Sequence, residues 1–326
     1  MRKFNASDNA KNEHGKIYQL ETEFLMATKL VFFNMKRFYF LTGSLVIITF
    51  HVFGQANRLD SIKYKKHEAD SLFIQVTEGG TRKEKVLHAE PLYIDLMRDL
   101  GARKGEKEWN VGLGMTDKLN YNSYLALVEY EFAPVDRLGL EIELPFEFYS
   151  GIPGSVNPDS RPGNRLKSLK LGAQYTFYVS EEKSTSAAIA YLHEFKIVEF
   201  SKMGNESIWA GNIFNPFFVI AKRWGTNFHT LLYTGPYLER FKNGRNDSWQ
   251  INASLHYMIT GSHSFIGLET NMDVWKNKFE AVFRPQMRLV ISEELMLGIV
   301  LGIPANFQTE RLSSFLRLIY EPGGTH

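Results

Sequence analysis

The chain has 326 residues, and its 38 basic and 36 acidic side chains leave a formal charge of +2, which gives no general attraction to nucleic acid. It contains no cysteine, so disulfides, thiolate metal sites and thiol nucleophiles are excluded. Aromatic residues make up 14% of a chain with a mean hydropathy of -0.24, a combination that suits a membrane barrel, because only alternate residues of each strand meet lipid.

A predicted export signal begins late in the chain. The basic start Met35-Lys36-Arg37 is followed by an apolar run over 38–53, which has the length of a signal core and is short for a membrane span. The small residues Gly54 and Ala56 follow it. We therefore predict a signal peptide over 35–54 and an over-extended start over 1–34. A cytoplasmic extension with an uncleaved anchor is the alternative.

Residues 55–106 are charged and mixed in character, and we predict that they form an N-terminal periplasmic segment or a plug of the domain that follows. Leu92, Leu96 and Leu100 recur at helical spacing. A short amphipathic helix over 92–100, packed against the following domain, is therefore predicted.

This segment also carries a resemblance to a known family. It reads His88-Ala89-Glu90-Pro91-Leu92-Tyr93-Ile94-Asp95, and 98–110 continue it as RDLGARKGEKEWN. These residues resemble the HAEPLYID family of outer-membrane proteins. The resemblance implies an outer-membrane location and no particular activity, so no catalytic residue is carried over from it.

The octapeptide contains residue types that bind metals, namely His88, Glu90 and Asp95. Pro91 breaks any helix there, and metal sites usually need a third or fourth ligand at a defined spacing. We therefore predict a structural role for this string, and no metal site.

From 107 to 321 the chain alternates apolar and polar residues, as β-strands do. In 138–148 the even positions are mostly apolar, whereas Glu141, Glu143 and Glu147 occupy odd positions. A period of two places these sets on opposite faces of a sheet. About twelve such segments occur, an even number typical of transmembrane antiparallel up-and-down β-barrels. They lie near 107–115, 122–133, 137–149, 165–180, 183–197, 214–224, 226–241, 247–259, 262–273, 276–291, 294–303 and 311–321.

The connections between these segments favour a membrane barrel. Tight turns alternate with connections that are generally longer, notably 150–164 and 198–213, which predicts that both ends of the domain are periplasmic. A soluble sandwich or lipocalin-like barrel is the alternative, but its apolar face points inward, and unpaired buried glutamates would be costly. The last strand ends on an aromatic residue, Tyr320, and the tail 322–326 follows.

The polar face of the strands supplies the candidate lumen residues. We expect an acidic arc on the second and third strands and a basic arc on the tenth and twelfth, with a transverse field across a wet interior that sorts solutes by charge. Pairing of these groups across a narrow, sealed interior is the alternative. The acidic candidates are Glu129, Glu131, Glu141, Glu143 and Glu147, and the basic ones are Arg284, Arg288 and Arg317.

Three functions follow from this architecture. The first is a passive, porin-like channel for small polar solutes, with no cofactor. The second is a non-conducting surface or assembly barrel that binds a partner through its outer loops. The third is a lipid hydrolase, but no G-x-S-x-G or other catalytic motif is found, so no enzyme is predicted. The expected partners are outer-membrane lipid and the export and barrel-assembly machinery. The oligomeric state is left open.

Overall fold

The computed structural model describes residues 60–79, 83–94, 96–154, 160–242, 244–276 and 278–323. The chain divides into two compact units, Met1–Lys63 and Tyr64–His326, and the second contains the sheet. The predicted over-extended start and signal peptide lie outside the described residues. Helix α2 (Asp60–Glu78) leads into the second unit. Among the described residues, no helix has the length and apolar character needed to cross a membrane.

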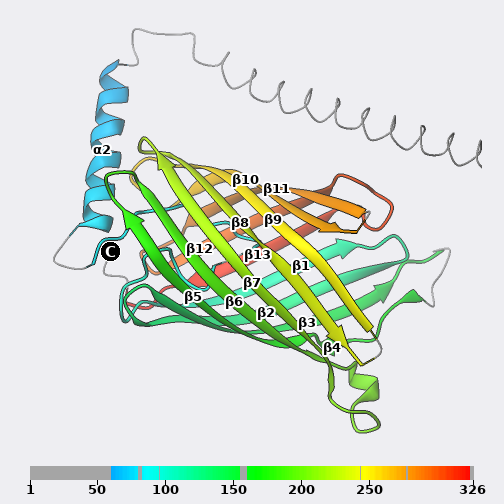
Figure 1. Cartoon of the computed structure of the whole chain (residues 1–326). Helices are drawn as coiled ribbons and strands as arrows, with labels where there is room; N and C mark the ends of the chain where they lie inside the picture. The colour runs from blue at the N-terminus through cyan, green and yellow to red at the C-terminus, as the bar shows by residue number, and fades with distance from the viewer. Residues whose placement is uncertain are drawn as a thin grey trace, which may run out of the picture. The chain divides into compact units, whose positions relative to one another are not determined.

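Twelve strands close into a ring (Figure 1). Each pairs antiparallel with its neighbours in chain order, and the last pairs with the first. A two-residue strand, β4 (Arg165–Leu166), pairs with β3 outside the ring. The predicted up-and-down barrel of about twelve strands is confirmed. The ring strands are β1 (Lys107–Asp117), β2 (Tyr121–Val135), β3 (Leu138–Gly151), β5 (Ser168–Ser180), β6 (Thr185–Ile197), β7 (Trp209–Trp224), β8 (Phe228–Phe241), β9 (Gly244–Met258), β10 (Phe265–Trp275), β11 (Lys278–Val290), β12 (Leu295–Pro304) and β13 (Ser313–Tyr320).

One strand begins well before its predicted start. β7 begins at Trp209, whereas the alternation predicted 214. Gly211 and Asn212 are residues typical of turns, but this stretch pairs with β6 on one side and with β8 on the other. Pairing on both edges satisfies the backbone and extends the strand into the predicted loop.

The connections only partly follow the predicted alternation of short and long. At the end of the barrel where β1 begins and β13 ends, the turns are short throughout. At the opposite end three connections are longer, namely 152–164, 198–208 and 305–312, with the short helix η2 (Phe200–Lys202) in the second. The other three connections there, 118–120, 242–243 and 276–277, are as tight as the turns. Both barrel termini lie at the short-turn end.

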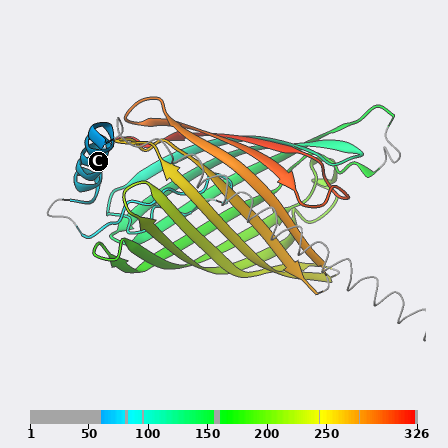
Figure 2. The ribbon, with the colours of Figure 1, turned by 90° about the horizontal axis from the view of Figure 1, so that it is seen from above.

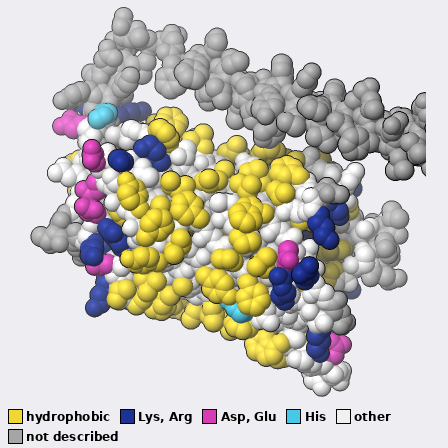
Figure 3. Space-filling model, in the orientation of Figure 1, with side chains coloured by type: hydrophobic (Ala, Val, Ile, Leu, Met, Phe, Trp, Pro, Cys, Tyr) yellow, Lys and Arg dark blue, Asp and Glu magenta, His cyan; other side chains and the backbone are white. Residues whose placement is uncertain are grey.

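The outer face of the ring is apolar. In β13, Leu316, Leu318 and Tyr320 are exposed, whereas Arg317 and Ile319 between them are buried. Figure 3 shows hydrophobic side chains over the middle of the visible barrel wall and charged side chains gathered toward its two ends. A soluble barrel would point its apolar residues inward, so this surface has the pattern of a lipid-facing wall.

Residues 83–106, called the plug from here on, lie inside the barrel at the short-turn end, beside α2 (Figures 1 and 2). The predicted helix over 92–100 is wrong, because the described residues there form bends and turns. Pro91 disfavours a helical start, and the backbone N–H groups of Leu92 and Ile94 donate to wall side chains rather than along a helix. Leu92, Leu96 and Leu100 are buried, but they pack against different parts of the wall.

Candidate functional site: a plugged, charge-lined lumen

Backbone N–H groups of the plug are satisfied by side chains of the barrel wall. Leu92 N donates to Gln286 Oε1 at 2.8 Å, and Ile94 N donates to Glu269 Oε1 at 3.1 Å. Ala89 N donates to His229 Nδ1 at 3.0 Å, and Gly101 N to Thr176 Oγ1 at 3.0 Å. The wall thus supplies the partners that secondary structure would otherwise give.

Apolar plug side chains fill the space between the strands. Leu92, Leu96 and Leu100 are each only 1–2% exposed. Leu92 joins an apolar cluster that contains Phe315, and Leu96 and Leu100 join a second cluster that contains Phe217. Full burial of one leucine is worth roughly 1.5–3 kcal/mol, so these contacts contribute substantially to holding the plug in place.

Three wall glycines allow the plug to approach the strands closely. A Cβ atom at Gly139 would lie 2.5 Å from the Met97 carbonyl oxygen, and one at Gly172 would lie 2.7 Å from Met97 Cγ. A Cβ at Gly298 would lie 2.9 Å from Leu92 Cδ2. The contact at Gly139 is with backbone, so no change of rotamer relieves it.

Substituting Gly139 with valine should therefore displace the plug while leaving the barrel folded. Valine suits a strand, but its side chain overlaps the plug backbone. The expected result is trypsin cleavage after Arg98 and Arg103, which are buried in the native protein. Gly151→Val is the matched control, because a Cβ at that end of β3 meets nothing within 4 Å. Unchanged protection in a folded Gly139→Val barrel would show that the plug tolerates the clash.

Helix α2 is fastened to the same end of the barrel. The Asp70 carboxylate accepts hydrogen bonds from Gly261 N and Asn227 Nδ2, both at 3.0 Å, in two turns between strands. Near the end of the helix, Glu78 forms an ion pair with Arg223 of β7. The helix therefore docks on the turns that follow β7 and β9.

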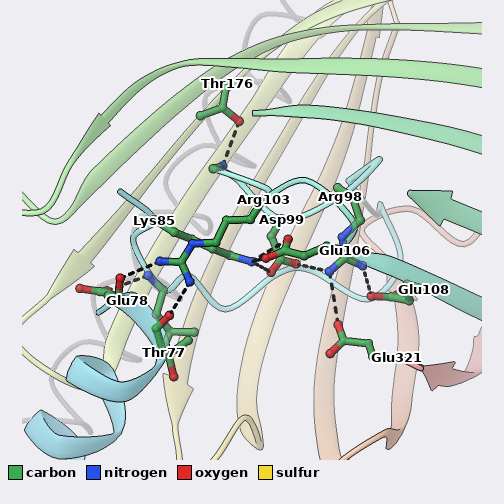
Figure 4. Close-up of polar contacts among 12 residues, drawn as sticks. Thr77, Glu78, Lys85, Arg98, Asp99, Arg103, Glu106, Glu108, Thr176 and Glu321 are labelled. Carbon is green, nitrogen blue, oxygen red and sulfur yellow. Dashed lines mark hydrogen bonds and ion pairs between the residues drawn. The ribbon is translucent and has the colours of Figure 1, made fainter. Parts of the chain in front are cut away.

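Arg103 of the plug binds the end of this helix. Its Nη1 donates to Thr77 O at 3.2 Å and its Nη2 donates to Glu78 O at 2.7 Å (Figure 4). Carbonyls in the last turn of a helix lack intrahelical partners, and a cation there also suits the helix dipole. Arg103 thus joins the plug to α2.

Arg98 lies in a cage of carboxylates. Its Nη1 is 2.6 Å from Glu108 Oε2 and 3.8 Å from Glu131 Oε2, and its Nη2 is 3.4 Å from Glu321 Oε1 (Figure 4). The Arg98 side chain is only 3% exposed. One plug residue therefore links β1, β2 and the chain end that follows β13, through buried charge.

A second ion-pair group lies next to this cage, within the plug itself. Lys85 Nζ is 2.6 Å from Asp99 Oδ2 and 2.9 Å from Glu106 Oε1. Burial opposes ionisation of Asp99, but Lys85 and Arg98 outweigh it and hold its pKa well below the usual value. Burial raises the pKa of Glu90 well above its usual value, and the Asp99 charge raises it further. Ionisation is thus favoured at Asp99 and opposed at Glu90.

The described residues of the octapeptide have separate structural contacts. His88 Nε2 is 3.0 Å from Ser186 Oγ on β6, and burial lowers the pKa of His88 well below its usual value, so the ring is neutral. Glu90 and His88 line the same cavity, but His88 Nε2 is engaged by Ser186, and Asp95 lies outside the described residues. The buried Ala89 and Leu92 pack against the wall.

A cavity of about 530 Å³ opens at the short-turn end of the barrel. It runs beside the plug, and its lining includes Lys85, His88, Glu90, Arg98 and Glu321. Its charged lining residues include members of both ion-pair groups described above. The cavity is therefore a polar vestibule at the plugged mouth.

The predicted acidic residues come together in two adjacent rows on the inner wall. Glu108 of β1 lies opposite Glu131 of β2, which lies opposite Glu141 of β3. In the next row Asn110, Glu129 and Glu143 occupy the same three strands, and the row continues through Lys170 of β5 to Glu194 of β6. We call these residues the acidic rows. Glu147 lies farther along β3, paired with Arg165 at 2.6 Å and with Lys167 at 3.1 Å.

The predicted basic arc is dispersed. Arg317 Nη2 lies 3.6 Å from Glu129 Oε2, because β13 pairs with β1 and β1 with β2. The expectation of an opposed arc is therefore wrong for this residue. Arg284 lies over the ring of plug residue Tyr93 at 3.3 Å from its centroid. Arg288 Nε donates to His263 O at 2.9 Å.

Several residues of this site were missed by the sequence analysis. Lys170 and Glu194 occupy polar positions in alternating strands, so period two alone was a signal for them. Asn110 and Glu108 carried the same signal in β1. Arg98 carried none, because it belongs to an irregular segment whose position depends on the wall.

A family model described as HAEPLYID-like matches residues 84–321. The chain is similar in structure to an outer membrane channel from Pseudomonas putida F1, with a TM-score of 0.56 and 12% identity over 70% of this chain and 99% of that chain. It also matches the NanC porin, with a TM-score of 0.48 and 9% identity over 65% of this chain and 98% of that one. The KdgM porin gives a TM-score of 0.45 and 12% identity, over 65% and 98%. The sequences of curated proteins give no match.

Proposed function

The chain belongs to the HAEPLYID-like family, and from its fold and lumen we propose that it is a bacterial outer-membrane channel for small polar solutes, closed in this state by its own plug. Export by a signal peptide and insertion by the barrel-assembly machinery are part of this proposal. So is the transport role, which the similar outer membrane channel from Pseudomonas putida F1 makes reasonable.

The observation that carries the proposal is the charged wall beyond the plug. Lys196 Nζ lies 3.2 Å from Glu239 Oε1, and Glu147 pairs with Arg165 and Lys167. The side chains of these pairs are 12–34% exposed, so they face a wet space. A permanently sealed interior would be filled more cheaply with apolar residues, because burying charges is costly.

The plug closes this lumen through contacts that can exchange with water. Most of its backbone contacts are single hydrogen bonds to wall side chains, and its charges form ion pairs. Among the described residues, only near its end do backbone hydrogen bonds join it to the wall, from Gly105 N to Ala133 O, from Ala133 N to Glu106 O and from Arg137 N to Ala102 O. No described plug residue belongs to a strand of the barrel. Withdrawal of residues 83–106 would open the short-turn end without breaking the ring.

Conductance in planar bilayers tests the proposal. The refolded chain from Gln55 should be closed for most of the recording, whereas Gly139→Val should show stable open steps. In that open variant, the further substitutions Glu141→Gln and Glu143→Gln should lower the preference for cations, and Glu280→Gln, an exposed carboxyl, should not. Electrical silence of a folded, unplugged barrel would end the channel proposal. Unchanged selectivity would end the role of the acidic residues.

A non-conducting barrel is the second candidate, and the plug itself is the observation that favours it. The connections 152–164 and 198–208 would then present a partner-binding surface at the end opposite the plug. A lipid hydrolase has less support, because the hydrogen-bonded pair of plug residue His88 and wall residue Ser186 is buried, away from lipid.

A further inference from the structure

The acidic rows contain more buried negative charge than their ion pairs neutralise. They hold six carboxyl groups, all at most 7% exposed: Glu108, Glu129, Glu131, Glu141, Glu143 and Glu194. Among the described residues, three cations form ion pairs with them, namely Arg98, Lys170 and Arg317. Six carboxyl groups against three cations leave an excess of three, which must be met by bound protons or by a bound cation.

Three of these carboxylates converge on one point. Glu129, Glu141 and Glu143 each place one oxygen within 4.8 Å of the other two. Oxygens that bind one Ca²⁺ lie about 2.3–2.6 Å from the ion, so a set at this spacing can share it. The arrangement arises from register, because Glu129 lies directly opposite Glu143, and Glu141 lies two residues along the same strand.

Glu141 has no other partner that would explain its position. Its carboxylate forms no hydrogen bond or ion pair with the described residues, although it is 7% exposed and points at the other two carboxylates. Glu143, in contrast, is bound by Lys170 at 3.0 Å, and Glu129 accepts a hydrogen bond from Asn110 at 3.0 Å. Glu141 is therefore the carboxylate of these three that has no direct ion pair or hydrogen bond with the described residues, and Lys170, which pairs with Glu143, acts on it only at longer range.

A buried amide lies in the same row. Asn110 Nδ2 donates to Glu108, Glu129 and Glu131, while its Oδ1 has no hydrogen-bond partner. Carboxylates combined with an amide oxygen are the ligand types that Ca²⁺ prefers, and water fills the remaining positions.

We propose that Glu129, Glu141 and Glu143 form a binding site for one divalent cation, Ca²⁺, on the inner wall of the barrel. The ion would join β2 to β3 and neutralise the excess charge of the acidic rows. This inference does not depend on whether the barrel conducts, and the sequence analysis, which predicted no metal site, had no access to the register that assembles it.

Titration of the refolded chain in detergent with Ca²⁺ alone, followed by calorimetry, tests the site. Detergent free of lipopolysaccharide removes lipid phosphates as an alternative ligand. One Ca²⁺ per chain should bind, with Mg²⁺ weaker, and the midpoint of thermal unfolding should be higher in Ca²⁺ than in chelator. Absence of saturable binding to the intact chain, or an equal midpoint in both conditions, overturns the proposal and leaves protons as the neutralising species.

Glu141→Gln separates the site from a general charge effect. It keeps the shape of the side chain and should weaken Ca²⁺ binding by about tenfold or more, because affinity follows the charge of the ligand set. Glu280→Gln removes an equal charge from an exposed position of β11 and should leave binding unchanged. Full binding by Glu141→Gln would overturn the assignment. If that variant does not refold, Glu141→Asp, which keeps the charge but shortens the reach, takes its place with the same expectation.

Discussion

Replacing Arg98 with methionine is expected to release the plug and to convert a closed barrel into an open one. The guanidinium is the only cation of the described residues within ion-pair distance of Glu108 and Glu131, and it also contacts Glu321. Removing one partner of a buried ion pair typically costs about 3–5 kcal/mol, because the remaining charge stays buried and uncompensated. Water that enters the cage from the adjoining vestibule relieves that cost, and it gains full access when the plug leaves.

The measurement combines bilayer conductance with the heat-dependent gel mobility of a folded barrel. Arg98→Met should retain the mobility shift and gain open steps. Arg311→Met is the control, because Arg311 forms an ion pair with Asp117 at 3.3 Å but is 59% exposed, and exposed pairs contribute little. If adding Glu108→Gln to Arg98→Met closes the barrel again, the uncompensated carboxylate is what expels the plug. A folded Arg98→Met barrel that stays closed would contradict this account of the cage.

The strands could be predicted because their lipid-facing and inward-facing residues obey a strict period. In β3 the polar positions Glu141, Glu143 and Glu147 all face inward, as the alternation required. The count of twelve followed from the same pattern, since each strand is long enough for several alternations. β7 was shortened in the prediction because Gly211 and Asn212 interrupt the signal locally, and pairing with two neighbours overrides it.

The sequence could predict which residues face the lumen, but not which of them pair. Pairing depends on which strands are neighbours in the closed ring. The sequence separates Arg317 from Glu129 by most of the barrel, yet closure of the ring brings them to 3.6 Å. Closure thus makes Arg317, which was predicted in an opposed basic arc, a partner of the acidic rows.

For residues 55–106 the sequence predicted either a periplasmic segment or a plug. It could not choose between them, because an irregular segment has no hydrophobic periodicity that would show which side is buried. Its leucines at helical spacing suggested a helix, but their spacing instead matches two separate apolar clusters of the wall. The glycines at the contact, Gly139 and Gly172, fall on the inward face of their strands, and only the position of Met97 explains them.

A reversible tether should decide whether the plug is the gate. A Cβ at position 172 lies 2.7 Å from Met97 Cγ, the atom whose place the sulfur of a cysteine at position 97 would take. In a disulfide, the Cβ of one cysteine lies about 3 Å from the sulfur of the other, so the geometry suits the bond. Met97→Cys with Gly172→Cys should therefore form a disulfide between plug and wall, in a chain that has no other cysteine.

The tether is most informative in the Arg98→Met background, where the barrel is expected to conduct. Oxidation should close it, and a reductant should reopen it in the same recording, because the bond holds Met97's segment against β5 at high effective concentration. Met97→Cys alone, treated in the same way, controls for oxidation. Equal conductance of the oxidised and reduced double-cysteine barrel would show that ions pass beside a seated plug. The acidic rows, rather than the plug, would then have to block the lumen in the closed state.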